Sequence, residues 1–179
     1  MALRSVDNVI WIADTLHMTT SHESSAVQLQ QLVDRTEIEA VQLRYATGVD
    51  SRDWELFRAC FADEVECDYS SVFGTPPARL GADEFVAMIA PVMSALTATQ
   101  HMMTNIAITF DDADHATVVA YVRAIHHNAA ADGGTEQTVY GYYTNTFVRT
   151  DDGWRISKVK LTSKIQTGNP GVFGALPAA

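Results

Sequence analysis

The sequence predicts one α+β domain, in which helices come first and a sheet of long antiparallel strands follows. Apolar residues recur at helical spacing over residues 26–49, whereas apolar and polar residues alternate in the second half of the chain. Turn signals at residues 111–114 and 151–153 separate the later segments. The 179 residues suffice for one domain with a buried core. We therefore expect a curved sheet that wraps over the helices.

The first long segment, residues 26–49, predicts a helix with one apolar face. Thr36 and Glu39 match a capping box, so this segment is either one long helix or a pair in which the second begins at Thr36. We interpret residues 1–25 as an N-terminal extension that packs on the domain or on a neighbouring subunit. The domain itself is expected over residues 26–167, with an irregular tail at 168–179.

The other elements follow from shorter patterns. Asp53 is an N-cap candidate for a short helix, and the Gly- and Pro-containing stretch after residue 70 indicates a loop. In order, we expect a helix at 53–61, a strand at 65–69, a loop at 70–79, a helix at 82–90 that Pro91 kinks or ends, and strands at 101–110, 116–128, 135–150 and 154–167.

Composition excludes several classes of function. Twelve basic against 22 acidic residues give a net charge of −10, which speaks against binding to nucleic acids or anionic membranes. Cys60 and Cys67 form neither a disulfide framework nor a metal motif, so reduced thiols in a cytoplasmic protein are expected. The apolar run at residues 9–13 is too short to span a membrane. The spacing of histidines and carboxylates also suggests no metal site.

Two of the six histidines are candidates for chemistry. His101 opens the first long strand, on the same face as Met103 and Asn105. His126 shares a strand face with small apolar residues, as the wall of a cavity would. A single histidine of this kind is more often a hydrogen-bonded structural residue. The remaining histidines lie in the extension, in a turn or on the opposite strand face: His17, His22, His115 and His127.

Asp50 closes the apolar helix and has two interpretations. It is either a solvated helix-end residue or a carboxylate that points into a pocket and orients a histidine. An Asp–His pair suits proton transfer, because the carboxylate holds the proton of one imidazole nitrogen and leaves the other nitrogen basic. No nucleophile motif or phosphate-binding loop accompanies it.

The tyrosines are more often packing residues, yet a phenol in a pocket polarises a carbonyl or assists a leaving hydroxyl. Tyr45 lies five positions before Asp50 on the helix. Tyr140 and Tyr142 share one face of a strand, whereas Tyr143 and Asn145 share the other.

Three motifs together resemble a known family. They are Tyr45-x4-Asp50, Thr99-Gln100-His101-x3-Asn105, and Thr144-Asn145-x-Phe147 followed by the run 153–158. This order resembles the SnoaL-like branch of the NTF2-like superfamily, and within it is similar to scytalone dehydratase, bile-acid 7α-dehydratase and hexachlorocyclohexane dehydrochlorinase. The resemblance covers residues 37–165.

The resemblance implies a cone-shaped α+β barrel around one deep pocket, and cofactor-free elimination by an Asp–His dyad. It places Asp50 and His101 on that dyad. Tyr45 matches a tyrosine of the steroid dehydratase, and His126 falls where scytalone dehydratase has its second histidine. The arginine of the dehydrochlorinase is unmatched near Val159, so loss of a hydroxyl group fits better than loss of a halide.

The sequence therefore predicts a lyase, a dehydratase of a small apolar cyclic or aromatic alcohol. His101, Asp50, Tyr45 and His126 are the expected catalytic residues, with Asp50 about 2.6–3.2 Å from a His101 nitrogen inside the largest pocket. The expected substrate-binding residues are Asn145, Tyr140, Tyr142, Met103 and Trp54.

Alternatives to the dehydratase remain open. They are an isomerase of the ketosteroid-isomerase type, a lyase that breaks a C–C bond and releases formaldehyde, and a non-catalytic binding or structural subunit. Because both faces of the long strands carry apolar residues, we also expect a homo-oligomer. The resemblance to the dehydratases implies a trimer more than a dimer.

Overall fold

The computed structural model describes the backbone of residues 7–174 and the side chains from residue 25 onward. The chain divides into two units, Met1–Thr36 and Glu37–Ala179, and each is described by itself. Helix α1 (Asp7–Ser51) contributes to both units, so helical structure begins well before the predicted start at residue 26. The predicted limits of extension, domain and tail stay predictions.

The first unit is the N-terminal part of α1. The expectation of a second helix starting at Thr36 is wrong, because α1 continues through this position. The Thr36 hydroxyl donates to the carbonyl of Leu32 at 3.0 Å, one turn back within the same helix. The threonine therefore satisfies its hydroxyl against the helix backbone instead of capping a new helix.

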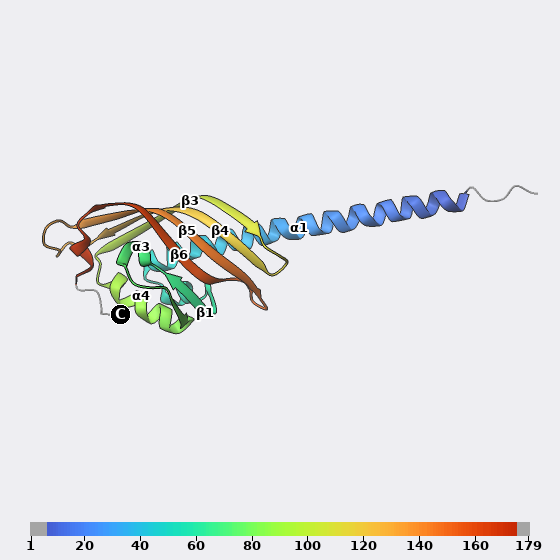
Figure 1. The fold of residues 1–179 in the computed structure, drawn as a ribbon. Helices are drawn as coiled ribbons and strands as arrows, with labels where there is room; N and C mark the ends of the chain where they lie inside the picture. Colours follow the sequence, from blue (N-terminus) through green and yellow to red (C-terminus); the bar gives the residue numbers. More distant parts are fainter. Residues whose placement is uncertain (1–6, 175–179) are drawn as a thin grey trace, which may run out of the picture. The chain divides into compact units, whose positions relative to one another are not determined.

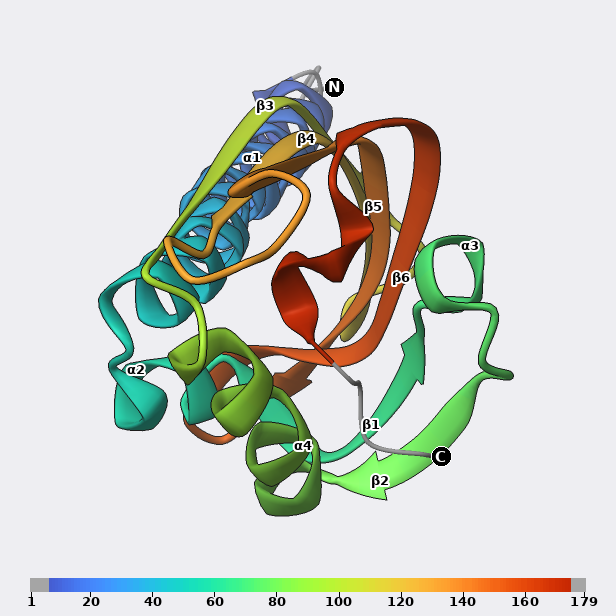
Figure 2. The same ribbon diagram turned by 90° about the vertical axis from the view of Figure 1, so that its left-hand side faces the viewer.

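The second unit contains the remaining elements, which Figures 1 and 2 show from two directions. In chain order they are α2 (Trp54–Arg58), β1 (Phe61–Asp68), α3 (Ser70–Phe73), β2 (Ala78–Gly81), α4 (Ala82–Ser94), β3 (Ala98–Phe110), β4 (His115–His127), β5 (Glu136–Thr150), β6 (Gly153–Gly168) and the 3₁₀ helix η1 (Pro170–Phe173).

The six strands form one sheet in the order β2-β1-β6-β5-β4-β3. The predicted antiparallel meander of β3 to β6 is confirmed, and β1 adds to β6 in parallel. The sheet curves around the last turns of α1 and around α4 (Figure 2). The α+β prediction and the wrapped sheet are thus correct for the second unit.

The core lies between the helices and the concave face of the sheet. The predicted apolar face of α1 is buried, with Ile38, Tyr45 and Val49 at most 3% exposed. The sheet contributes the fully buried Val118, Phe147 and other side chains of its inner face. Burial of this apolar area is the main favourable contribution to folding.

Three expectations for shorter elements are wrong. Residues 70–79 are not one loop, because they contain α3 and the start of β2, whose backbone pairs with β1. Of the two alternatives for Pro91, the end of the helix is wrong: α4 continues to Ser94, since a proline removes one N–H donor while its own carbonyl still accepts from Ala95 at 3.1 Å. The tail forms η1, and its Val172 is buried.

The helix expected at 53–61 ends early. Asp53 caps α2 as predicted, accepting from the N–H of Leu56 at 2.9 Å. The helix stops at Arg58 because Phe61 already opens β1, where it pairs with Ile156 of β6.

A bulge in β3 changes which residues face inward. Asn105 has φ = 51°, and the pairing with β4 shifts between Thr104 and Ala107. The side chains of Met103 and Ile106 pack against the core, whereas Asn105 is exposed. The expectation that Asn105 shares a face with His101 is therefore wrong, because the extra residue exchanges the two faces.

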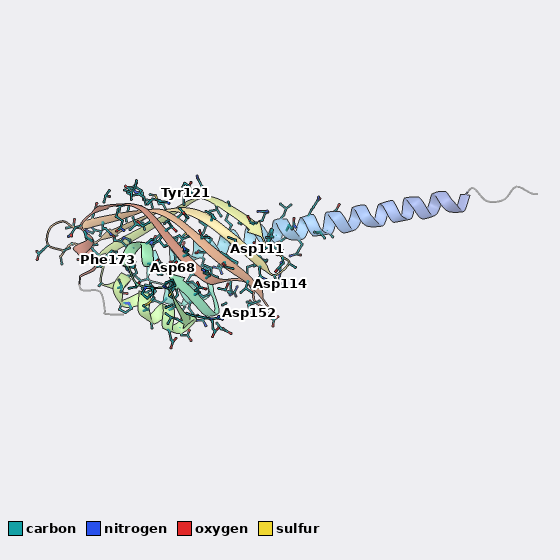
Figure 3. The ribbon with its side chains drawn as sticks, viewed as in Figure 1. Asp68, Asp111, Asp114, Tyr121, Asp152 and Phe173 are labelled. Carbon is teal, nitrogen blue, oxygen red and sulfur yellow. The ribbon has the colours of Figure 1, made fainter. Side chains whose placement is uncertain are left out.

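The outer face of the sheet carries exposed apolar side chains, among them Tyr121 at 54% (Figure 3) and Ile165 at 60%. The expected homo-oligomer would cover such a face, and it stays a prediction. Among the helices that the structure describes, none is both long and apolar enough to cross a membrane.

Gly48 gives a testable prediction for the join between α1 and α2. A Cβ at this position would lie 2.8 Å from the backbone N and 2.9 Å from the Cα of Phe57. Gly48→Ala should lower the free energy of unfolding by about 1–3 kcal/mol in urea titrations, because two backbones must separate. The control Gly81→Ala, whose Cβ would meet nothing nearer than 3.6 Å, should be near neutral. A stabilised Gly48→Ala, as helix propensity alone predicts, would contradict this.

Candidate active site

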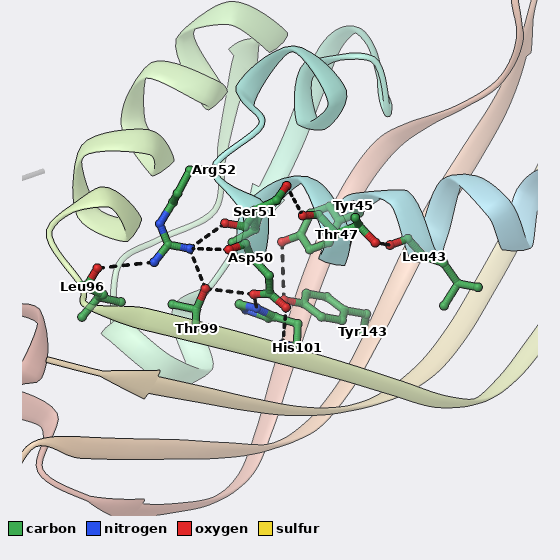
Figure 4. A network of polar contacts seen from close by, with 11 residues as sticks. Leu43, Tyr45, Thr47, Asp50, Ser51, Arg52, Leu96, Thr99, His101 and Tyr143 are labelled. Atoms are coloured by element: carbon green, nitrogen blue, oxygen red, sulfur yellow. Dashed lines mark hydrogen bonds and ion pairs between the residues drawn. The ribbon is translucent and has the colours of Figure 1, made fainter.

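The site is built where the C-terminal end of α1 meets β3. Asp50, the last residue but one of α1, turns its carboxylate toward His101 of β3 (Figure 4). The Nδ1–H of His101 donates to Asp50 Oδ1 at 2.7 Å, and the backbone N–H of the same histidine donates to Oδ2 at 2.7 Å. The distance of 2.7 Å between His101 Nδ1 and Asp50 Oδ1 lies within the predicted range. One carboxylate therefore joins α1 to β3.

A third donor completes the surroundings of Asp50. The hydroxyl of Thr99 donates to Oδ1 at 2.9 Å. Burial by itself would raise the pKa of Asp50, but the hydrogen bonds from His101 and Thr99 outweigh it, so this pKa is lowered. The carboxylate is therefore ionised at neutral pH. It retains the proton on Nδ1 of His101, which leaves Nε2 as the basic nitrogen.

A cavity of about 50 Å³ lies beside this pair. His101 and His126 line it together with three tyrosines and with apolar side chains such as Val49, Ile89 and Leu161. The expectation that the pair would lie in the largest pocket is wrong, since a hollow of about 460 Å³ lies elsewhere, lined by outer-face residues such as Tyr121.

The three tyrosines form one hydroxyl cluster. The Tyr45 hydroxyl lies 2.9 Å from that of Tyr69 and 3.4 Å from that of Tyr143. Burial raises the pKa of all three phenols well above their usual range, so each keeps its proton at neutral pH. The three hydroxyl groups carry three protons, and two of these form the hydrogen bonds within the cluster. One proton is therefore left to donate to an oxygen atom in the cavity.

His126 is buried next to the pair. Its ring centre is 5.6 Å from that of His101 and 4.8 Å from that of Phe173. Burial, followed by the nearby imidazole of His101, lowers the pKa of His126 to about 4, so the ring is neutral at neutral pH. Its Nδ1 is buried and has no hydrogen-bond partner among the residues that the structure describes.

The structure does not bring Tyr140 and Tyr142 to this cavity. Both line the outer hollow, where Arg123 lies over the ring of Tyr140 and Lys164 over that of Tyr142. Successive strand residues alternate between faces, so Tyr143 points inward and these two point outward.

The other three expected substrate-binding residues also lie off the cavity. Asn145 is fully buried, donating to Gln42 Oε1 at 2.9 Å and accepting from the N–H of Lys160 at 3.3 Å. The amide of Gln42 in turn contacts the sulfur of Met103 at 3.1 Å. Trp54 packs edge-on against Phe57. Asn145, Gln42 and Met103 thus form one chain of contacts, and Trp54 packs against the edge of the core.

Sequence reasoning missed several residues of the site. Tyr69 follows the inward positions Val65 and Cys67 at a spacing of two, a signal that was available from the alternation. Phe173 comes from the tail, where no periodic pattern indicated an element. It lines the cavity from η1.

The described residues offer no metal site and no exposed thiol. Within the described residues, no three His, Cys, Asp or Glu side chains gather as a metal site would require. Both cysteines are free and buried, and burial raises the pKa of the Cys60 thiol to about 12.

Comparisons with known proteins agree with this geometry. The SnoaL-like domain family matches residues 30–160. A scytalone dehydratase-like protein of Claviceps purpurea is 28% identical over 135 residues, covering 71% of this chain and 85% of its own. A crystal structure of a Kribbella flavida protein is 37% identical, with a TM-score of 0.76, over 81% of this chain and 99% of the other.

A more distant structure, hexachlorocyclohexane dehydrochlorinase LinA-type3 from Novosphingobium barchaimii, shares the fold. It is 20% identical with a TM-score of 0.66, over 84% of this chain and 99% of its own. The family match spans most of the second unit and includes Asp50, His101 and all three tyrosines of the hydroxyl cluster. The chain belongs to the SnoaL-like domain family, within the NTF2-like superfamily.

Proposed function

We propose that the chain is a cofactor-independent lyase that eliminates water from a small, largely apolar cyclic or aromatic alcohol. The observation that carries this proposal is the Asp50–His101 pair, held at 2.7 Å beside a mainly apolar cavity. The similarity to a scytalone dehydratase-like protein and to a dehydrochlorinase supports elimination as the reaction class.

The pair supplies the base. Nε2 of His101 takes a proton from a carbon next to a carbonyl group, and the C–H electron pair moves toward that carbonyl. Asp50 stabilises the imidazolium by charge and holds its orientation. When the C–O bond breaks, the imidazolium returns the proton to the leaving hydroxide, so that water is the only by-product.

The tyrosine cluster supplies the hydrogen bond to oxygen. Negative charge develops on the carbonyl oxygen as the proton leaves, and a buried phenol donor stabilises it more strongly than water does. Tyr45 lies centrally in the cluster, and its partners Tyr69 and Tyr143 come from β1's end and from β5. His126, neutral and unpaired at Nδ1, offers a second polar contact for the departing hydroxyl group.

Two alternatives use the same residues. An isomerase or a formaldehyde-releasing C–C lyase would need the same base and the same oxygen contact, and only the products separate them: water loss, unchanged mass, or loss of one carbon. The mass of the product decides among the three reactions.

One observation favours a non-catalytic subunit as the second candidate. A cavity of about 50 Å³ holds a few water molecules and no ring. A ring-sized substrate therefore requires some of the side chains that line the cavity to move, and Phe173 of η1 is one of these lining residues. The position of the Asp50–His101 pair beside a cavity supports the enzyme, because a non-catalytic subunit has no need of such a pair at a cavity.

Substitution of the pair tests the base. His101→Ala should lower kcat by about 10²–10⁴-fold because the proton acceptor is lost. Asp50→Asn should cost nearly as much with the fold intact, since an amide does not stabilise an imidazolium by charge. The measurement is water loss by mass spectrometry on ring alcohols chosen by thermal shift.

A second Asp–His pair in the same chain provides the control. His115 Nδ1 lies 2.9 Å from Asp112 Oδ1 in an exposed turn. His115→Ala and Asp112→Asn should keep wild-type turnover. Full activity of His101→Ala on a verified substrate would exclude the proposed base.

The tyrosine cluster is tested by removing one hydroxyl. Tyr45→Phe should lower kcat roughly 10–100-fold, because one donor to the developing charge is lost from the cluster. Tyr121→Phe removes a hydroxyl on the outer face of the sheet and is the matched control. Equal rates for Tyr45→Phe and wild type would show that the cluster serves packing alone.

His126 gives a prediction for stability against pH. Its pKa is about 4 in the folded chain and roughly 6.5 when unfolded, so between these values only the unfolded chain binds the proton. Stability should therefore fall as pH falls through this window, by up to about 3 kcal/mol. His126→Asn should lose less stability between pH 7 and pH 4 in urea titrations, with exposed His115→Asn as the control. An unchanged loss in His126→Asn would contradict the assignment.

A further inference from the structure

We propose that Arg52 and Thr99 are positioning residues, in which Arg52 acts through the Thr99 hydroxyl to fix Asp50 against His101. The inference rests on the proposed role of the Asp50–His101 pair and adds to it two residues that do not line the cavity. It concerns how the carboxylate is held, and it is independent of which alcohol the enzyme takes.

Arg52 adopts an unusual backbone conformation directly after α1. Its φ of 61° lies in the left-handed region, which residues other than Gly, Asn and Asp seldom occupy. This conformation directs the guanidinium back over the end of the helix. Nη1 donates to the carbonyls of Val49 at 2.8 Å and Asp50 at 3.2 Å, and Nη2 reaches the carbonyl of Leu96 at 3.5 Å.

The hydrogen bond on which the proposal depends joins Arg52 to the hydroxyl of Thr99. Nη1 of Arg52 donates to Thr99 Oγ1 at 2.7 Å, and Thr99 Oγ1 lies 2.9 Å from Asp50 Oδ1 (Figure 4). An arginine donates only, so the Thr99 oxygen must accept from it and turn its own proton elsewhere. The proton then points to Asp50. Arg52 thereby sets the direction of the hydroxyl that holds Oδ1.

The fixed hydroxyl restricts the carboxylate. Oδ1 accepts from Thr99 and from Nδ1 of His101, while Oδ2 accepts from the backbone N–H of His101. Rotation of the carboxylate would break these three hydrogen bonds at once. A threonine hydroxyl free to rotate would offer Asp50 either its proton or a lone pair, and the second orientation repels the carboxylate.

The lowered pKa of Asp50 agrees with a directed Thr99 hydroxyl. All four acceptors that the structure gives to the Arg52 guanidinium are neutral oxygens, and one of them is the Thr99 hydroxyl that donates to Asp50. The titratable groups that face Asp50 from other elements are His101 of β3, His126 of β4 and Tyr143 of β5. The hydrogen bonds from His101 and Thr99 lower the pKa of Asp50, so the relay reaches this pKa through Thr99.

The experiment follows Asp50 and His101 by NMR in the full chain, and it needs no substrate. The carboxyl ¹³C resonance of Asp50 reports its titration, and the downfield Nδ1–H proton of His101 reports the hydrogen bond between the two side chains. Thr99→Val removes the hydroxyl at nearly constant volume. Arg52→Asn removes the guanidinium but retains a residue that tolerates positive φ.

We expect both variants to raise the pKa of Asp50 and to shift and broaden the Nδ1–H resonance. Thr99→Ser should restore the wild-type values. In the Thr99→Val background, Arg52→Asn should add little, because the hydroxyl through which it acts is gone. With a verified substrate, each single variant should lower kcat roughly tenfold with KM little changed.

Thr117 offers the matched control, since its hydroxyl donates to Asp111 Oδ2 at 2.9 Å in an exposed turn. Thr117→Val should leave both Asp50 and His101 signals unchanged. Wild-type signals in Arg52→Asn, or full additivity of the two substitutions, would overturn the relay. These readouts are independent of turnover, so a failed relay is distinguishable from a failed lyase: the latter appears as full activity of His101→Ala.

Discussion

The carboxylate of Asp50 joins the end of a helix to the first long strand of the sheet. It accepts one hydrogen bond from the β3 backbone and two from β3 side chains, so the position of α1 and the orientation of His101 are set by the same group. A buried carboxylate needs such donors, because burial alone disfavours its charge. The fold and the candidate chemistry thus share one electrostatic requirement.

Two kinds of polar group line the otherwise mainly apolar cavity. His101 and His126 present imidazole rings, and Tyr45, Tyr69 and Tyr143 present phenols that keep their protons because burial raises their pKa. In this mainly apolar setting, hydrogen bonds to a developing negative charge are stronger than in water. The proposed elimination needs a proton acceptor and a hydrogen-bond donor to oxygen, and the curved sheet with α1 brings such groups to one cavity.

Much of the fold was predictable because local periodicity encodes it. The alternation along β3 to β6 and the apolar face of α1 around Tyr45 reflect which side chains must leave water, and this depends on neighbouring residues alone. Elements that owe their form to distant partners were missed. Strand β2 exists through its pairing with β1, and η1 is ordered around the buried Val172. The bulge at Asn105 changed the inward face for the same reason.

For the candidate site, the sequence by itself determined the two residues of the pair: Asp50 at a helix end and His101 on a strand, at a spacing that resembles a known family. Only the tertiary structure decided what surrounds them. It brought Tyr69, Tyr143 and Phe173 to the cavity from three separate elements, and it directed Tyr140, Tyr142 and Asn145 elsewhere. The alternation of residues along a strand shows which side chains share a face. Which of the two faces lines a cavity depends on the curvature of the sheet and on side chains that are distant in the sequence.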